Sequence, residues 1–200
     1  MLGGGHEVAF ASWSGLAQHC YRAGGVPPRI GIVNLDAHLD LRDPAQGASS
    51  GTPFAQIAAR CQAEGWGFHY ACFGASRAAN TRTLWRRAEA LGVTLREDRE
   101  IALRPLAETL AALQAFMARC DQLYLTLDLD VLPAAQAPGV SAPAAYGVAL
   151  AQIEALAECV RDSGKLRVID IAELNPRIDS DGRTARAAAR LLHQLTLDAR

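Results

Sequence analysis

Aspartate and histidine side chains gather in a short segment that follows an apolar stretch of this 200-residue sequence. Residues 31–35 are mostly apolar, and Asp36, His38 and Asp40 come directly after them. Alternate side chains of an extended segment point to the same side, so these three groups can face one another. Carboxylate and imidazole groups are metal ligands, and the spacing therefore indicates a candidate metal site.

A second acidic cluster has the same relation to an apolar segment. Residues 123–127 lead into Asp128 and Asp130. Carboxylates among leucine and valine side chains are costly to bury unless cations neutralise them. Either cluster alone also fits a solvated turn or a cap. Their combination, with each cluster at the end of an expected strand, favours metal chemistry over that alternative.

A histidine near the start of the sequence adds a further candidate ligand. Residues 3–5 are all glycine, which permits the tight backbone path that can deliver His6 to the mouth of a sheet. Two histidines and four aspartates offer mainly oxygen donors, and these suit Mn²⁺ better than the thiolate-rich chemistry of zinc. Four carboxylates also match the charge of two divalent ions.

Apolar segments alternate with segments of helical composition along the chain. Four buried strands are expected, at residues 29–35, 67–73, 122–127 and 166–171. Helices are expected at residues 8–24, 53–64, 80–92, 105–119, 148–163 and 182–198. This alternation predicts an α/β fold with a mostly parallel sheet between helices on both faces. Ligands of such sheets bind beyond the carboxyl ends of the strands, where both acidic clusters lie.

Composition and charge narrow the class of partner. Lys and Arg number 20 against 21 for Asp and Glu, so neither nucleic acid nor a membrane surface is favoured, and a small-molecule substrate is expected. The five cysteines include no C-x-x-C pair, which argues against a disulfide framework and a zinc finger. With neither a membrane span nor a signal peptide in the sequence, a cytoplasmic location is expected. Residues 1–200 show no composition break and are expected to form a single domain.

Four motifs give the sequence a specific resemblance. G-G-x-H, D-A-H-x-D, D-x-D followed by A-P-G, and E-x-N-P occur in this order and end in His6, Asp40, Gly139 and Pro176. The sequence thereby resembles the metal-dependent ureohydrolases, the family of arginases, agmatinases and formimidoylglutamases. The resemblance covers essentially all 200 residues. It implies a three-layer α/β/α fold with two Mn²⁺ ions per chain.

The resemblance also implies roles for individual residues. One manganese ion is expected among His6, Asp36, Asp40 and Asp128, and the other among Asp36, His38, Asp128 and Asp130. Asp36 and Asp128 would then bridge both ions, which together activate a water molecule for hydrolysis. Glu173 matches the family glutamate that orients the cationic amidine or guanidine group through charge-assisted hydrogen bonds. Its alternative is an ordinary surface carboxylate.

Local variants of the motifs resemble formimidoylglutamases more than arginases. The segments G-G-G-H-E at residues 3–7 and S-S-G-T-P-F at residues 49–54 are of this type. In the second segment Ser50 stands where arginases and agmatinases place a proton-transferring histidine, so that step is in doubt here. A serine still hydrogen-bonds substrate or water.

Residues 74–82 resemble a further formimidoylglutamase segment and offer Arg77 and Asn80 to a dicarboxylate substrate. Arg77 is expected to grip a carboxylate with two hydrogen bonds. Alternatively, Arg77 and Arg82 are solvated residues at a helix start and Asn80 is the N-cap.

Together these features imply a binuclear manganese hydrolase that converts N-formimidoyl-L-glutamate and water to L-glutamate and formamide, in histidine degradation. Two alternatives stay open: another ureohydrolase of the guanidinobutyrase, agmatinase or arginase type, and a non-catalytic truncated remnant. The second arises because family members extend well upstream of the G-G-x-H motif. The sequence is thus expected to be an N-terminally truncated form, comprising the C-terminal two-thirds of the family fold. The resemblance also suggests a homo-oligomer.

Overall fold

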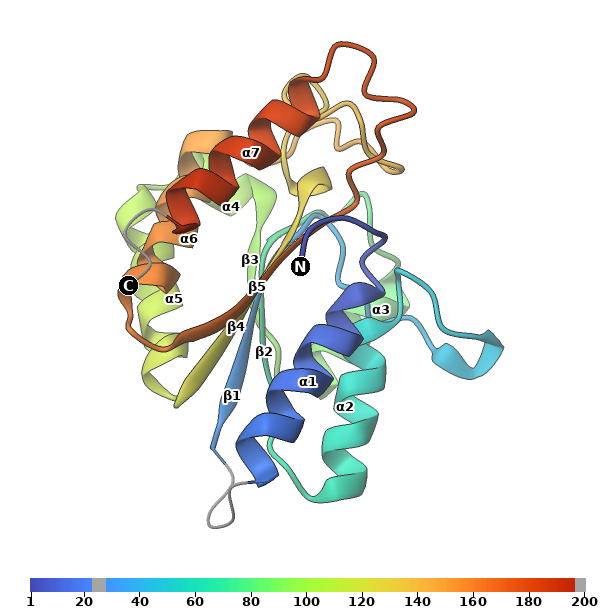
Figure 1. Ribbon diagram of the computed structural model, residues 1–200, viewed down its shortest axis with the longest axis vertical. Coiled ribbons are helices and arrows are strands. Elements are labelled where there is room, and N and C mark those ends of the chain that lie inside the picture. The colour runs from blue at the N-terminus through green and yellow to red at the C-terminus, as the bar shows by residue number, and fades with distance from the viewer. Residues whose placement is uncertain (23–27, 197–200) are drawn as a thin grey trace.

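The computed structural model describes residues 1–22 and 28–196 (Figure 1). Its centre is a five-stranded parallel sheet in the order β3-β2-β1-β4-β5. The strands are β1 (Ile30–Leu35), β2 (His69–Ala75), β3 (Thr94–Glu97), β4 (Gln122–Asp128) and β5 (Leu166–Ala172). All six residues of the central strand β1 are buried, as expected for a strand that is covered on both faces.

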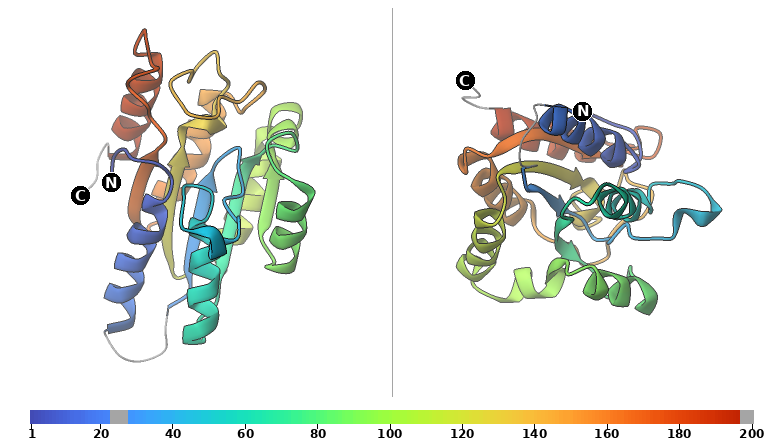
Figure 2. Two further views of the ribbon diagram at one scale, coloured as in Figure 1. Left: turned by 90° about the vertical axis from the view of Figure 1, so that its right-hand side faces the viewer. Right: turned by 90° about the horizontal axis from the view of Figure 1, so that it is seen from below.

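Helices cover both faces of the sheet (Figures 1 and 2). One face packs against α1 (Val8–Arg22), α2 (Pro53–Glu64) and α3 (Arg82–Ala90). The other packs against α4 (Asp98–Leu103), α5 (Leu106–Ala118), α6 (Leu150–Asp162) and α7 (Arg183–Thr196). Because strand side chains alternate, Ile32 of β1 joins the first core and Val33 the second. The predicted three-layer α/β/α architecture is confirmed.

The strand order reverses between β1 and β4, which are neighbours in the sheet although β2 and β3 separate them in sequence. Such a reversal opens a crevice beyond the carboxyl ends of the two strands. D-A-H-L-D follows β1, and β4 ends in Asp128, which leads into the short 3₁₀ helix η2 (Leu129–Val131). Both acidic clusters therefore lie at the same point of the sheet.

The first residues of the chain run alongside β5. Leu2 forms a parallel bridge with Ile171, and the Gly3 N–H donates to the Ile171 carbonyl oxygen at 2.9 Å. Gly3 and Gly4 both have a φ of +89°, a region that side chains other than glycine rarely adopt. The glycines thus turn the chain from the sheet edge toward α1 and bring His6 to the carboxyl end of the sheet.

Gly74 allows β2 to approach the loop that follows β1. The register of β2 with β3 shifts between Phe73 and Ala75, and Gly74 has a φ of +112°. A Cβ atom there would lie 2.4 Å from Cγ2 of Val131 and 3.1 Å from the carbonyl oxygen of Asp36. Because Gly74 has no side chain, β2 packs directly against the start of residues 36–40, which follow β1 and which we call the acidic loop.

The four predicted strands are confirmed, with ends that differ by no more than two residues. Two elements, β3 (Thr94–Glu97) and α4 (Asp98–Leu103), were not predicted from the sequence. Among the described residues β3 pairs only with β2. It is short and has four half-buried side chains, so it lacks the apolar run of the other strands.

The six predicted helices are present with small changes at their ends. The helix expected at 80–92 begins at Arg82, because the Thr81 side chain caps it by accepting a hydrogen bond from the Leu84 N–H. Asn80 is therefore not the N-cap. The expected ends of the first and last helices, at 23–24 and 197–198, lie outside the described residues. Within the residues that are described, no helix is long and apolar enough to cross a membrane.

Candidate metal centre

Four acidic or imidazole side chains converge at the carboxyl ends of β1 and β4. Ligand atoms of His6, Asp36, Asp40 and Asp128 all lie within 4.8 Å of one another, and all four residues are buried. The His6 Nδ1 atom lies 2.9 Å from Asp40 Oδ2, 3.1 Å from Asp36 Oδ2 and 3.2 Å from Asp128 Oδ2. This arrangement, which we call the first ligand group, surrounds one point with three carboxylates and one ring nitrogen.

A second ligand group shares Asp36 with the first. It comprises Asp36, His38 and Asp130, again with ligand atoms within 4.8 Å of one another. The His38 Nδ1 atom lies 2.9 Å from Asp130 Oδ2 and 3.6 Å from Asp36 Oδ1. Asp36 thus turns one oxygen to each group. Asp128, which the resemblance places beside both ions, belongs here to the first group alone.

Asn80 holds the acidic loop from behind. Its Oδ1 atom accepts a hydrogen bond from the Leu39 N–H at 2.9 Å, and its Nδ2 donates to the carbonyl oxygens of Ala37 and Ser76, both at 2.9 Å. Asn80 is only 7% exposed. Ala37 and Leu39 alternate with the candidate ligands along the loop. The Asn80 carboxamide therefore holds the backbone of this loop in place.

An acidic pocket of about 220 Å³ opens above the two ligand groups. It is lined by His38, Asp40, Arg42, Ser50, Gly51, Asp128, Asp130, Ser141, Ala142 and Glu173. The structure therefore places Ser50 and Glu173 in the same pocket lining as four of the candidate ligands. Arg42 and Ser141 were missed. Arg42 follows Asp40 at the next alternate position, and this spacing could have identified it.

Glu173 is held in a conformation that places its carboxylate at the pocket. Its Oε1 accepts a hydrogen bond from the His6 backbone N–H at 2.9 Å, and its Oε2 accepts one from Ser141 Oγ at 3.0 Å. Glu173 has a φ of +69° and Asp40 a φ of +47°, and no other non-glycine residue described here has a positive φ. Such conformations cost about 1–3 kcal/mol each and tend to occur at functional sites.

Arg77 lies outside this pocket. Its guanidinium forms an ion pair with Glu97, with Nη2 2.6 Å from Oε1, and stacks over the Trp85 ring at 4.2 Å from the centroid. The structure therefore joins Arg77 to β3 and α3 and not to the ligand groups. It does not bring Arg77 and Asn80 together with Ser50 and Glu173.

Burial and mutual repulsion determine how the carboxylates of the metal-free site titrate. Burial, with the charge of Asp36, raises the pKa of Asp40 and of Asp130 to about 6 each. Burial raises the pKa of Asp128 well above its usual value, and the charges of Asp130 and Asp36 add to this effect. Burial alone would also raise the pKa of Asp36, but hydrogen bonds from His38 and His6 hold it below its usual range.

The two histidines respond in the opposite way. Burial alone would lower the pKa of His38, but hydrogen bonds with Asp130 and Asp36 outweigh it and raise the pKa to about 11. The pKa of His6 is likewise raised well above its usual value despite burial, through Asp128, Asp36 and Asp40. Without a cation, protons therefore provide the positive charge that the carboxylates require.

The residues present fit divalent cations. His6 Nδ1 is a buried nitrogen without a hydrogen-bond partner, and it faces three carboxylates. A buried polar atom in this state signals an absent ligand. Carboxylate oxygens with a minority of imidazole nitrogens match the preference of Mn²⁺. Both ligand groups are therefore candidate manganese sites.

We expect the increase in melting temperature caused by saturating Mn²⁺ to be small at pH 5 and larger at pH 7.5. Because the folded-state pKa values of Asp40 and Asp130 are raised to about 6, protons on these two carboxylates add to the competition with metal below that pH. The raised pKa values of the carboxyl and imidazole groups also mean that the metal-free protein loses stability as pH rises from about 4 upward. Scanning fluorimetry with and without metal measures both effects.

The exposed Glu64 at the end of α2 provides a control, because it lies outside the pocket and Glu64→Gln should leave the Mn²⁺-induced shift intact. An Mn²⁺-induced shift of equal size at pH 5 and pH 7.5 would contradict this prediction.

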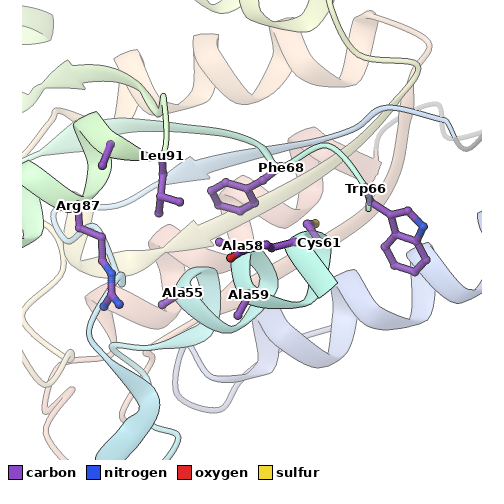
Figure 3. Close-up of a pocket in the computed structure, with 10 residues that line it drawn as sticks. Ala55, Ala58, Ala59, Cys61, Trp66, Phe68, Arg87 and Leu91 are labelled. Atoms are coloured by element: carbon purple, nitrogen blue, oxygen red, sulfur yellow. The ribbon is translucent and has the colours of Figure 1, made fainter. Parts of the chain in front are cut away.

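A larger cavity, of about 390 Å³, lies between α2 and α3 (Figure 3). Its lining is Ala55, Ala58, Ala59, Cys61, Gln62, Trp66, Phe68, Arg87, Ala90 and Leu91. No carboxylate and no histidine lines it. Neither candidate ligand group therefore borders this cavity.

Comparison with known proteins agrees with this geometry. The sequence pattern of the arginase family matches residues 1–197. The chain is 56% identical over 196 residues to a formimidoylglutamase of Aeromonas salmonicida, covering 98% of this chain and 61% of that one. The crystal structure of formimidoylglutamase from Bacillus subtilis superposes with a TM-score of 0.83 at 25% identity, covering 97% of this chain and 58% of that one.

A Trypanosoma cruzi formiminoglutamase crystallised with Mn²⁺ has the same fold, with a TM-score of 0.81 at 24% identity over 98% of this chain and 63% of that one. The chain spans about three-fifths of the length of the curated relatives that it matches. The match over 197 residues, with the ligand residues at the carboxyl ends of β1 and β4, means that this chain belongs to the arginase family.

Proposed function

We propose that the protein is a binuclear manganese hydrolase of carbon–nitrogen bonds in linear amidines. Its proposed substrate is N-formimidoyl-L-glutamate, which with water gives L-glutamate and formamide. The observation that carries this proposal is the pair of ligand groups that share Asp36 beneath a pocket containing Glu173. Relatives named formimidoylglutamase, at 56% identity for the Aeromonas salmonicida protein, support the choice of substrate.

The first ligand group would hold one manganese ion and the second group the other. When bound, two such ions lower the pKa of a water molecule and stabilise negative charge in the transition state. Glu173 supplies the complementary group for substrate, since an ionised carboxylate accepts charge-assisted hydrogen bonds from a cationic amidine. The His6 N–H and Ser141 keep the Glu173 carboxylate at the pocket wall.

Ser50 is the candidate for hydrogen bonding near the leaving group. His38 is the histidine that lines the pocket, and it belongs to the second ligand group. A hydroxyl both donates and accepts, so Ser50 can hold a water molecule or the leaving nitrogen. In this proposal protonation of the leaving group does not require a histidine at residue 50.

Arg42 is our candidate for the substrate carboxylates, alongside the sequence-based candidate Arg77. Arg42 is exposed at the pocket, and its guanidinium forms no ion pair within residues 1–22 and 28–196. Its backbone N–H donates to the Gly51 carbonyl oxygen at 2.9 Å, and a Cβ at Gly51 would lie 2.8 Å from Arg42 Cδ. Gly51 therefore leaves room for the arginine side chain beside the pocket. Arg77, in contrast, is paired with Glu97.

We expect Arg42→Met to raise KM for formimidoylglutamate by about 10- to 100-fold, as loss of a charge-assisted hydrogen bond predicts. Arg77→Met should change KM less than about 2-fold, because Arg77 is outside the pocket lining. Steady-state kinetics of both variants decides between the two arginines. A larger effect at Arg77 would transfer the carboxylate-binding role to that residue.

Substrate comparison tests the function itself. We expect the purified, manganese-loaded protein to release formamide from N-formimidoyl-L-glutamate faster than it releases urea from arginine, agmatine or guanidinobutyrate. Because Glu173 serves a guanidinium group equally well, urea release without formamide release would select another ureohydrolase activity. Near-zero manganese content at saturating Mn²⁺ would select a non-catalytic scaffold, an alternative that remains because the chain spans 61% of its relative.

Three wider proposals accompany this function. Residues 1–200 act as one ureohydrolase domain, corresponding to the C-terminal two-thirds of the family fold. The protein acts on a small molecule as a homo-oligomer. All five cysteines are free thiols, which supports our proposal of a reducing cytoplasmic environment.

A further inference from the structure

A buried carboxylate that belongs to neither ligand group lies behind the first one. Asp170 of β5 is fully buried and is the register partner of Thr126 on β4. Its Oδ1 accepts a hydrogen bond from Thr126 Oγ1 at 2.5 Å, and its Oδ2 accepts one from the Tyr124 hydroxyl at 2.6 Å. Tyr124 and Thr126 are two residues apart, so both side chains point to the same face of β4.

Asp170 has hydroxyl partners but no arginine or lysine ion pair within the described residues. Burial of an ionised carboxylate is costly even when hydrogen bonds satisfy both oxygens, and an apolar side chain of similar size would avoid that cost. The burial of Asp170 thus needs a reason other than stability. The chain of contacts that begins at Asp170 supplies one.

Thr126 connects Asp170 to His6. Thr126 Oγ1 lies 2.9 Å from His6 Nε2, and both atoms are buried. Thr126 has a single hydroxyl hydrogen, and it donates this hydrogen to Asp170 Oδ1. The Thr126 oxygen must then accept from His6, which requires a hydrogen on Nε2.

When a cation takes the place of the second ring proton, hydrogen on Nε2 leaves the lone pair of Nδ1 for the metal. His6 Nδ1 is the atom that faces Asp36, Asp40 and Asp128 and has no hydrogen-bond partner. We propose that Asp170, acting through Thr126, is a positioning residue that fixes the tautomer and orientation of His6 for metal binding at Nδ1. This inference rests on the metal centre in the proposed function and adds a role for two residues outside the ligand groups.

We call the contacts from Asp170 through Thr126 to His6 the relay. Manganese titration of the purified protein, followed by the electron paramagnetic resonance signal of free Mn²⁺, tests it. We expect Thr126→Val, which keeps the shape but removes the hydroxyl, to weaken one of the two sites by about 10- to 100-fold and to leave the other unchanged. Thr126→Ser restores the hydroxyl and should bind both ions as the unsubstituted protein does. Site selectivity and rescue by serine distinguish positioning from a general loss of structure.

Tyr124→Phe is the matched control, because it removes the other hydrogen bond to Asp170 without touching His6. It should bind two ions with unchanged affinity. Circular dichroism establishes that each variant is folded, and Thr126→Ala replaces the valine variant if that one unfolds. Full affinity at both sites without the Thr126 hydroxyl, or equal weakening by serine and valine, overturns the relay. Absence of manganese binding by the unsubstituted protein overturns the metal centre and the relay with it.

Discussion

Replacing Asp36 with asparagine should reduce bound manganese from two ions per chain to less than one and lower turnover by more than about 100-fold. Asp36 is the residue common to both ligand groups, with Oδ2 3.1 Å from His6 Nδ1 and Oδ1 3.6 Å from His38 Nδ1. An asparagine offers one neutral oxygen in place of two that share a negative charge. Metal analysis and steady-state kinetics measure both effects.

Variants at Asp128 and Asp130 test the sharing of ligands between the two ions. Asp130→Asn should weaken one ion only, because Asp130 belongs to the second group alone. The family resemblance makes Asp128 a second bridge, so Asp128→Asn should then be as severe as Asp36→Asn. In the structure Asp128 belongs to the first group only. If it binds only that ion, Asp128→Asn should lose as much manganese and activity as Asp40→Asn. Retention of two tightly bound ions by Asp36→Asn would refute the shared-ligand assignment.

Glu173→Gln should lower kcat/KM for formimidoylglutamate by about 100-fold while leaving manganese binding unchanged, since charge-assisted hydrogen bonds contribute about 1.5–3 kcal/mol. The substitution removes the charge that attracts the cationic amidine and turns an amide N–H toward it. Glu173 lines the pocket but belongs to neither ligand group, so metal content should stay at two ions. Kinetics and metal analysis of the same sample check both halves of the prediction.

Ser141→Ala is the control for this effect. It removes the 3.0 Å hydrogen bond to Glu173 Oε2 and keeps the bond from the His6 N–H to Oε1. The expected loss is about 10-fold or less, as for one neutral donor. If Glu173→Gln lost manganese together with activity, Glu173 would instead have to be assigned to the metal centre.

Several features of the protein follow from its sequence alone. Apolar runs of five to seven residues predict buried strands, because a strand between two helix layers is apolar on both sides. Acidic residues directly after two of these runs predict the two clusters, because parallel strands all present their carboxyl ends at one edge of the sheet. Ligand types and the three-layer fold could therefore be predicted before any coordinates were known.

Other features depend on contacts between distant segments, which local sequence patterns do not encode. Arg42 reaches the pocket and Arg77 does not, because Glu97 on the unpredicted strand β3 pairs with Arg77. Asn80, predicted to meet substrate, bonds the backbone of the acidic loop across more than 40 residues of sequence.

Only the tertiary structure places Asp170 behind His6, through a register between β4 and β5 and a 2.9 Å contact from Thr126 to the chain's sixth residue. The positive φ angles of Asp40 and Glu173 are likewise set by the tertiary structure. Each is locally unfavourable and persists because long-range hydrogen bonds and packing hold it. Sequence determined which groups are available for chemistry, and the packing of distant strands and loops decided which of them meet.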